Sequence, residues 1–245
     1  TRLGGLDTGF DSLQMQIDMQ ASQQSGLGDQ HLIYFQERRL AFAQIAGGWP
    51  PNVNSEVELK EAQQRMTDDL QRLESYLQVN RESQLAFECY GDLLRMAHNL
   101  NIPNAAGIAD KVLSGVVAEN PNNYDATVAL ASLYVTLHQD LAPKAEALFN
   151  RAVELKPDVG NALIYQGLGL ACVYQGKWEQ ALVHLGKYLD MVPTDKRISD
   201  LQKNLSRGHY PTLIHTPLNP SPTIAESKSV VPKLQKEDKP WWRLW

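Results

Sequence analysis

The chain has 245 residues, of which 43% are hydrophobic and 21% charged, and it carries a net charge of −5 at pH 7. That length and composition allow a sizeable core, in one elongated domain or two compact ones. The negative charge argues against a general affinity for nucleic acid, because neutralising phosphates requires clusters of lysine and arginine. No apolar run reaches the roughly 18 residues that a membrane-spanning helix requires.

Residues 1–29 include several glycines and glutamines and predict an extended arm that buries little surface by itself. Two apolar patterns overlap within this arm. An alternating pattern, typical of a strand, comprises Leu13, Met15, Ile17 and Met19. A pattern with steps of three or four residues, typical of a helix face, comprises Leu6, Phe10, Leu13 and Ile17. The residues alone permit both interpretations.

Two helices are expected next, over residues 30–46 and 55–77, with glycine and proline turns between them. Ser55 and Glu58 form a capping box at the start of the second helix. Apolar residues then recur at steps of three and four: Leu59, Ala62, Met66, Leu70, Leu73 and Leu77. We interpret residues 30–83 as a divergent helical pair.

One pattern recurs three times at a spacing of 36 residues. It consists of a small residue, a large apolar residue, a packing residue and a proline. The copies are Ala109, Leu113, Val116 and Pro121; Ala145, Phe149, Ala152 and Pro157; and Ala181, Leu185, Tyr188 and Pro193. The first three positions of each copy form one face of a helix, and proline cannot continue a helix interior. Internal repetition at this period indicates a stacked array of helical units.

A further apolar segment precedes each copy and contains a large residue beside a small one: Tyr90-Gly91, Leu130-Ala131 and Leu168-Gly169. Each unit is therefore expected to hold two helices joined by a turn, over residues 84–121, 124–157 and 162–195. Residues 194–205 predict a terminal helix with Thr194 as its N-cap. Its polar outer side suits the end of the array.

Together these residues resemble the tetratricopeptide repeat family, most closely over 162–195. Cys172 takes a position where that family usually has tyrosine, and Tyr188 takes the position of a usual alanine. The resemblance implies an all-α fold. It would be a right-handed α-solenoid of helix-turn-helix repeats over 84–206, with extended N- and C-terminal arms.

The resemblance also implies a partner-binding surface, because solenoids bind along a concave side lined by the first helix of each pair. The residues it places there are Arg95, Asp125, Val128, Ser132, Gln166, Leu170 and Tyr174, accompanied by Glu88, Asp92, Met96, Val135, Thr136 and Val173. Family members that clamp a terminal carboxylate use lysine, arginine and asparagine, which are almost absent here. The expected partner is therefore an apolar or mildly basic protein segment. Alternatively, Leu170 and Val173 belong to the core between repeats.

Residues 207–245 form a proline-rich tail that ends in the sequence KPWWRLW. Trp241, Trp242 and Trp245 cannot form a core by themselves, and exposed aromatic clusters usually meet a partner or a bilayer interface. We expect these tryptophans to dock on a partner subunit or on another copy of the chain. Packing of the tail onto its own body is the alternative.

No combination of residues predicts catalysis or metal binding. Cys89 and Cys172 lack the spacing of a metal site and are expected to be buried thiols rather than a disulfide. Neither Cys89 with His98 nor Cys172 with His184 has the spacing that would bring a nucleophile and a base together on one helix. We therefore expect no enzymatic activity and no cofactor.

These features favour a non-enzymatic scaffold or assembly subunit that binds other proteins through its repeats and arms. A peripheral membrane assembly factor, held at the lipid headgroups by the tryptophans beside Lys239 and Arg243, is the alternative. The sequence starts at Thr1 without methionine, which fits removal of a signal peptide or anchor and equally fits a shortened chain. The expected location is periplasmic or membrane-associated, with the cytoplasm as the alternative.

Overall fold

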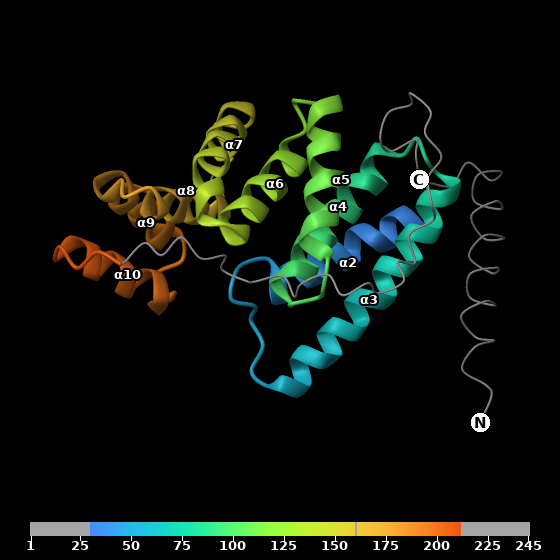
Figure 1. Cartoon of the computed structure of the whole chain (residues 1–245), viewed down its shortest axis with the longest axis horizontal. Helices are drawn as coiled ribbons and strands as arrows, with labels where there is room; N and C mark the ends of the chain where they lie inside the picture. Colours follow the sequence, from blue (N-terminus) through green and yellow to red (C-terminus); the bar gives the residue numbers. More distant parts are fainter. Residues whose placement is uncertain (1–29, 160, 212–245) are drawn as a thin grey trace. The chain divides into compact units, whose positions relative to one another are not determined.

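The computed structural model describes residues 30–159 and 161–211 (Figure 1). These residues form α-helices and one short 3-10 helix, with no strand among them, so the prediction of an all-α fold is confirmed. The arm over 1–29 and the tryptophans at 241, 242 and 245 lie outside the described residues. The described chain divides at Ile102 into two compact units, called unit 1 (30–102) and unit 2 (103–211).

Unit 1 contains three mutually packed helices, α2 (Gln30–Ala46), α3 (Glu56–Val79) and α4 (Gln84–Asn99). Its core is formed by large side chains from all three helices: Phe35, Phe42, Met66, Leu73, Tyr76, Leu93 and Met96. The Ser55 hydroxyl accepts a hydrogen bond from the Glu58 backbone N–H, as the capping box predicts. The Glu58 carboxylate accepts from the backbone N–H of Asn54 rather than from that of Ser55.

Helix α4 belongs to unit 1, although the repeat register of the sequence begins at residue 84. It packs against both α2 and α3. Its face around Glu88 and Arg95 forms polar contacts with α2 and with the turn that follows α2. The compact units therefore divide the chain at the turn after α4.

Unit 2 contains α5 (Ala105–Glu119), α6 (Tyr124–Leu137), the 3-10 helix η1 (Gln139–Leu141), α7 (Ala142–Leu155), α8 (Ala162–Tyr174), α9 (Trp178–Met191) and α10 (Lys196–Ser206). Each α-helix packs against the next, and α6 also packs against α8 (Figure 1). One buried cluster joins α6, α7 and α8, and a second joins α8, α9 and α10. The core is therefore continuous along the stack from α6 to α10.

The threefold register predicted from the sequence is visible in the burial of the second helices of unit 2. The small and large apolar residues of all three copies are buried: Ala109, Leu113 and Val116; Ala145, Phe149 and Ala152; Ala181, Leu185 and Tyr188. The helices end at Glu119, Leu155 and Met191, two residues before each repeated proline. The small residues Ala145 and Ala181 are completely buried.

The cap predicted for α10 is wrong by one residue. Asp195, and not Thr194, is the N-cap, and its carboxylate accepts hydrogen bonds from the backbone N–H groups of Arg197 and Ile198. The Tyr188 hydroxyl donates to the same carboxylate at 2.9 Å. Asp195 therefore caps α10 and ties it to α9, a tertiary contact that the local sequence does not reveal.

The first residues of the tail are held against the helical body. Tyr210 stacks on Trp178 of α9, with ring centroids 4.6 Å apart and an interplanar angle of 14°. The stack fixes the position at which the tail leaves unit 2, beside the start of α9.

Candidate functional site

Helix α8 carries no charged residue along its whole length. Four of its side chains, Leu163, Gln166, Leu170 and Tyr174, follow each other at steps of three and four and are half-buried. We call this set the α8 stripe. Such spacing places the four side chains on one side of the helix. The stripe is therefore a partly exposed surface of apolar, amide and phenol groups.

Two glycines allow α8 to approach its neighbours closely. A Cβ added at Gly167 would lie 2.9 Å from Cε1 of Phe149 in α7 and closer still to other atoms of that ring. A Cβ added at Gly169 would lie 2.7 Å from Cγ of Leu185 in α9. Since real Cβ atoms do not make such contacts, only glycine lets both neighbours pack at this distance. The α8 stripe is thus set on a rigidly packed helix.

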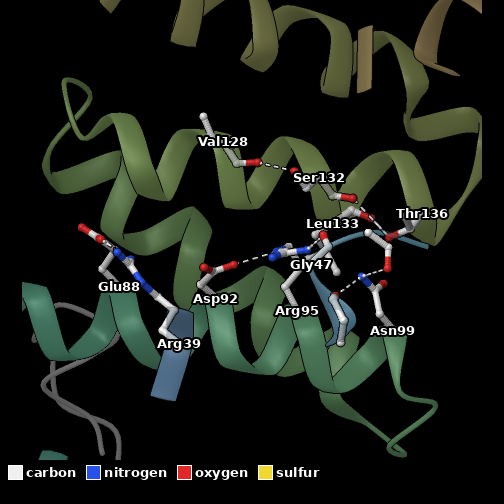
Figure 2. Close-up of polar contacts among 12 residues, drawn as sticks. Arg39, Gly47, Glu88, Asp92, Arg95, Asn99, Val128, Ser132, Leu133 and Thr136 are labelled. Carbon is white, nitrogen blue, oxygen red and sulfur yellow. Dashed lines mark hydrogen bonds and ion pairs between the residues drawn. The ribbon is translucent and has the colours of Figure 1, made fainter. Parts of the chain in front are cut away.

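The residues predicted for partner binding occupy different environments within unit 2. Val128 is buried in the cluster that joins α6, α7 and α8, and Leu170 and Tyr174 pack against this cluster while remaining half-buried. The Ser132 hydroxyl donates to the Val128 carbonyl at 2.8 Å (Figure 2). Asp125 is exposed in the first turn of α6.

The alternative assignment to the core between helices is supported by the structure for Val173 and partly for Leu170. Val173 is buried in the cluster of α8, α9 and α10. Leu170 packs against both clusters and keeps part of its surface exposed. Of the predicted set, Gln166, Leu170 and Tyr174 come together on the α8 stripe, whereas Val128 and Ser132 are buried.

Arg95 lies in unit 1 and its polar contacts are internal. Its Nε donates to Asp92 Oδ1 at 2.7 Å, and its Nη1 donates to the Gly47 carbonyl at 2.8 Å (Figure 2). Asn99, one turn further along α4, donates to the carbonyls of Ala46 and Gly48. These bonds hold the turn that follows α2, so Arg95 has a structural role within unit 1, and its role in partner binding stays a prediction.

Two further ion pairs connect α2 to its neighbours. Arg39 Nη1 donates to Glu88 Oε1 at 2.7 Å, as Figure 2 shows. Arg38 Nε donates to Asp69 Oδ2 at 2.6 Å, and the Tyr34 hydroxyl donates to the other oxygen of Asp69. These pairs cannot be predicted from the sequence, because the partners are 31 to 49 residues apart and follow no repeated spacing.

A polar cluster joins α7 to the turn between α8 and α9. One oxygen of Glu146 accepts hydrogen bonds from Gln175 Nε2 and Lys177 Nζ, each at 2.6 Å. Burial by itself would raise the pKa of Glu146, but the bonds from Lys177 and Gln175 outweigh it and leave this pKa lowered. The carboxylate is thus held ionised at the end of the helix pair, where it aligns the turn with α7.

Cys172 and His184 lie near this cluster without forming a nucleophile–base pair. The polar partner of the Cys172 thiol is Gln180 Oε1, at 4.0 Å. Burial and the negative charge of Glu146 raise the pKa of Cys172 to about 11. Since the thiolate is the reactive form, a thiol with this pKa is a poor nucleophile at neutral pH. Nδ1 of His184 is buried and has no hydrogen-bond partner.

Both cysteines are buried and neither forms a disulfide, as predicted. Over residues 30–159 and 161–211, no group of three or more histidine, cysteine or acidic side chains is arranged to hold a metal ion. Within the same residues, no helix has both the length and the apolar character needed to cross a bilayer.

The polar cluster predicts a loss of stability on acidification. Burial, and then the nearby Lys187, lower the pKa of His184 in the folded state, against the opposing effect of Glu146. As pH falls below about 6.5, His184 is therefore protonated in the unfolded chain before it is protonated in the folded chain. The free energy of unfolding falls as a result. The stability that Glu146 contributes is present above its unfolded pKa of about 4.3 and is lost at lower pH, as the folded carboxylate is protonated.

We expect His184→Gln to flatten the decline in the free energy of unfolding between about pH 6.5 and 5, and to leave the steeper decline below about pH 4.5 in place. Urea unfolding followed by circular dichroism across this range measures both parts. An unchanged slope between pH 6.5 and 5 in the variant would show that His184 does not titrate as its burial requires.

Comparison with known proteins adds no family to this geometry. No protein-family model matches the chain, and no curated protein sequence matches it.

Proposed function

We propose that this protein is a non-enzymatic scaffold or assembly subunit that binds other proteins, built as a right-handed α-solenoid of tetratricopeptide-like repeats. The threefold burial of equivalent residues in α5, α7 and α9 supports the repeat assignment. The packing of each helix of unit 2 against the next supports a stacked array. In such arrays each repeat contacts mainly its neighbours and leaves a long surface for binding.

The α8 stripe is the observation that carries the proposal. A surface without charges loses little hydration energy when a partner covers it, whereas burying an unpaired charge is costly. The stripe combines two leucines with Gln166 and Tyr174, which offer both apolar area and hydrogen bonds. Protein interfaces are depleted in charge at their centre and enriched in tyrosine. The stripe therefore has the composition of an interface centre.

The chemistry of the stripe favours an apolar or mildly basic partner segment. Asp125, in the first turn of α6, is exposed and offers a negative charge within unit 2. The carboxylate of Glu146 already accepts hydrogen bonds from Gln175 and Lys177, so its negative charge is less available to a partner. A segment with one or two basic residues beside apolar ones could pair a basic side chain with Asp125 and cover the α8 stripe with its apolar side chains.

The direct test is affinity purification of the full chain from its native source, with the wild type compared with Leu170→Arg. Placing a charge at the centre of the stripe is expected to reduce recovery of the co-purified partner at least about tenfold, which corresponds to ~1.4 kcal/mol of binding free energy. Leu170 is half-buried, so circular dichroism must first show that the variant remains folded.

The matched control is Val183→Arg, since Val183 is an exposed large apolar residue on the adjacent helix α9. This control is expected to retain the partner. Equal recovery with the wild type, Leu170→Arg and Val183→Arg would remove the stripe from the binding surface. Equal loss in both variants would show that added charge, and not the stripe, matters.

We also propose that the tail takes part in assembly through Trp241, Trp242 and Trp245, which the sequence places at the end of a proline-rich tether. The Tyr210–Trp178 stack supports this role, because it anchors the base of the tether to unit 2. A tethered aromatic cluster raises the effective concentration of a second contact while the repeats bind elsewhere. Changing all three tryptophans to alanine in the same purification measures that contribution.

Attachment to a membrane surface is a second candidate, favoured by the three tryptophans beside Lys239 and Arg243. Aromatic and basic side chains together bind at the lipid headgroup region. Flotation of full-length and 1–238 chains with anionic vesicles separates the two candidates. Flotation that depends on the tail, without any protein partner, would favour the membrane.

A further inference from the structure

Helix α2 leaves an apolar face uncovered within unit 1. Ile33 and Leu40 are 50% and 64% exposed, and they lie seven residues apart. Seven residues fall about 20° short of two helical turns, so both side chains lie on the same face, roughly 10 Å apart. Their neighbours on this face include the exposed Ala41 and Gln44.

The opposite face of α2 accounts for its packing in unit 1. Phe35, Phe42 and Ala46 are buried there, and α2 contacts α3 and α4. Arg38 and Arg39 are bonded to Asp69 and Glu88 on those two helices. Helix α2 therefore buries one face in unit 1 and leaves Ile33 and Leu40 exposed on the other. These two exposed apolar side chains offer a contact surface for a further helix.

We propose that residues 1–29 of this chain supply that element, as a helix that packs antiparallel on the outer face of α2. The stripe Leu6, Phe10, Leu13 and Ile17 has the spacing of a helix face. Three of the four aspartates of this region, Asp7, Asp11 and Asp18, lie about a third of a turn away from the stripe in such a helix. The segment would therefore cover apolar surface while keeping its charges in water.

The register follows from the spacing of the exposed residues. Phe10 and Ile17 are seven residues apart, as are Ile33 and Leu40. In an antiparallel pair Ile17 then faces Ile33, and Phe10 faces Leu40, if the chain reverses near residue 25. The sequence SGLGD at 25–29 contains two glycines, which suit a helix end and a turn. Glu37, between the two contacts, is long enough to extend its carboxylate past the edge of the pair.

A segment joined directly to α2 has an advantage over any separate partner. The connection makes docking an intramolecular event with a high effective concentration. The ends of helical arrays also require a capping element with a polar outer side. The helical interpretation of the arm is thus selected over the strand, because only a helix matches the seven-residue spacing on α2.

Disulfide trapping in the full-length chain tests the proposal. The test pair is Phe10→Cys with Leu40→Cys, and the control pair is Asp11→Cys with Leu40→Cys, which moves one thiol off the predicted face. The native cysteines do not compete, since Cys89 and Cys172 are fully buried. Under mild oxidation we expect the test pair to form an intramolecular disulfide about fivefold faster than the control pair, because a disulfide requires facing Cβ atoms.

A second measurement uses accessibility and does not replace Phe10 with cysteine. Maleimide labelling of Ile33→Cys is expected to speed up about fivefold when Phe10→Asp and Leu13→Asp are added, because charged side chains cannot cover an apolar face. Circular dichroism verifies that unit 1 stays helical in these variants.

Each alternative outcome overturns the proposal. Equal rates for the two cysteine pairs would mean that the tether brings the segment near α2 without docking it. Disulfides between chains, seen as dimers on non-reducing gels, would assign the face to a second copy. Absence of any disulfide together with unchanged labelling of Ile33→Cys would leave the face for another protein.

Discussion

Gly169→Val is expected to lower the free energy of unfolding of unit 2 by about 3 kcal/mol, at the upper end of the usual cost of overpacking. Gly169 lies where α8 packs closely against Leu185 of α9. A Cβ there would stand 2.7 Å from Leu185 Cγ and 3.4 Å from the Leu185 backbone nitrogen. Leu185 is fully buried. The Leu185 side chain must therefore shift, which disturbs the buried cluster that α9 shares with α8 and α10.

The matched control is Gly107→Ala in α5, where an added Cβ meets nothing within 4 Å. Alanine in an exposed helix is favoured over glycine, so this variant is expected to stabilise unit 2 by about 0.5–1 kcal/mol. Urea unfolding of both variants, followed by circular dichroism, gives the comparison. A loss below about 1 kcal/mol for Gly169→Val would show that the α8–α9 contact can relax and is not tightly packed.

Asp92→Ala is expected to destabilise unit 1 by about 3 kcal/mol, because it leaves the charge of a buried arginine without its carboxylate. The side chain of Arg95 is 4% exposed, and its bond to Asp92 is 2.7 Å long. The negative charge of Asp92 also acts on Arg39. Burial by itself would lower the pKa of Arg39. The negative charge of Asp92 and the bond to Glu88 both act to raise it, and the pKa is raised overall. One carboxylate therefore compensates two buried or half-buried guanidinium groups.

An exposed ion pair of unit 1 provides the comparison. Glu56 and Lys60 are 79% and 71% exposed, and exposed pairs contribute at most about 1 kcal/mol. Glu56→Ala should therefore change the unfolding midpoint little. If Asp92→Ala proves as mild as Glu56→Ala, the Arg95 side chain must reach water in solution, and its bond to the Gly47 carbonyl would not hold the turn.

The helical elements of both units could be predicted because their causes are local. Apolar residues at steps of three and four lie on one face of a helix. A proline two residues beyond the last helical residue prevents the helix from continuing. The repeated positions, such as Ala145, Phe149 and Ala181, are buried as the 36-residue register predicts. Ser55 caps α3, as its sequence suggests.

The candidate site could be predicted only in part. The sequence places the candidate residues on the first helix of each pair, and of these Gln166, Leu170 and Tyr174 lie together on α8. Val128 and Ser132 are equivalent to them in the repeat register but are buried. A repeat register specifies which side of a helix a residue occupies, and the neighbouring helices then decide how much of that side remains exposed.

The sequence by itself determined the all-helical class, the positions of the helices and the apolar faces they bury, since these depend on spacing along one segment. The tertiary structure alone decided the polar partners. Arg95 bonds to the Gly47 carbonyl, Glu146 to Lys177, and Asp195 both caps α10 and accepts from Tyr188. Burying apolar surface needs only the right periodicity, whereas a hydrogen bond needs two atoms within about 3 Å, and that distance is set by packing between helices.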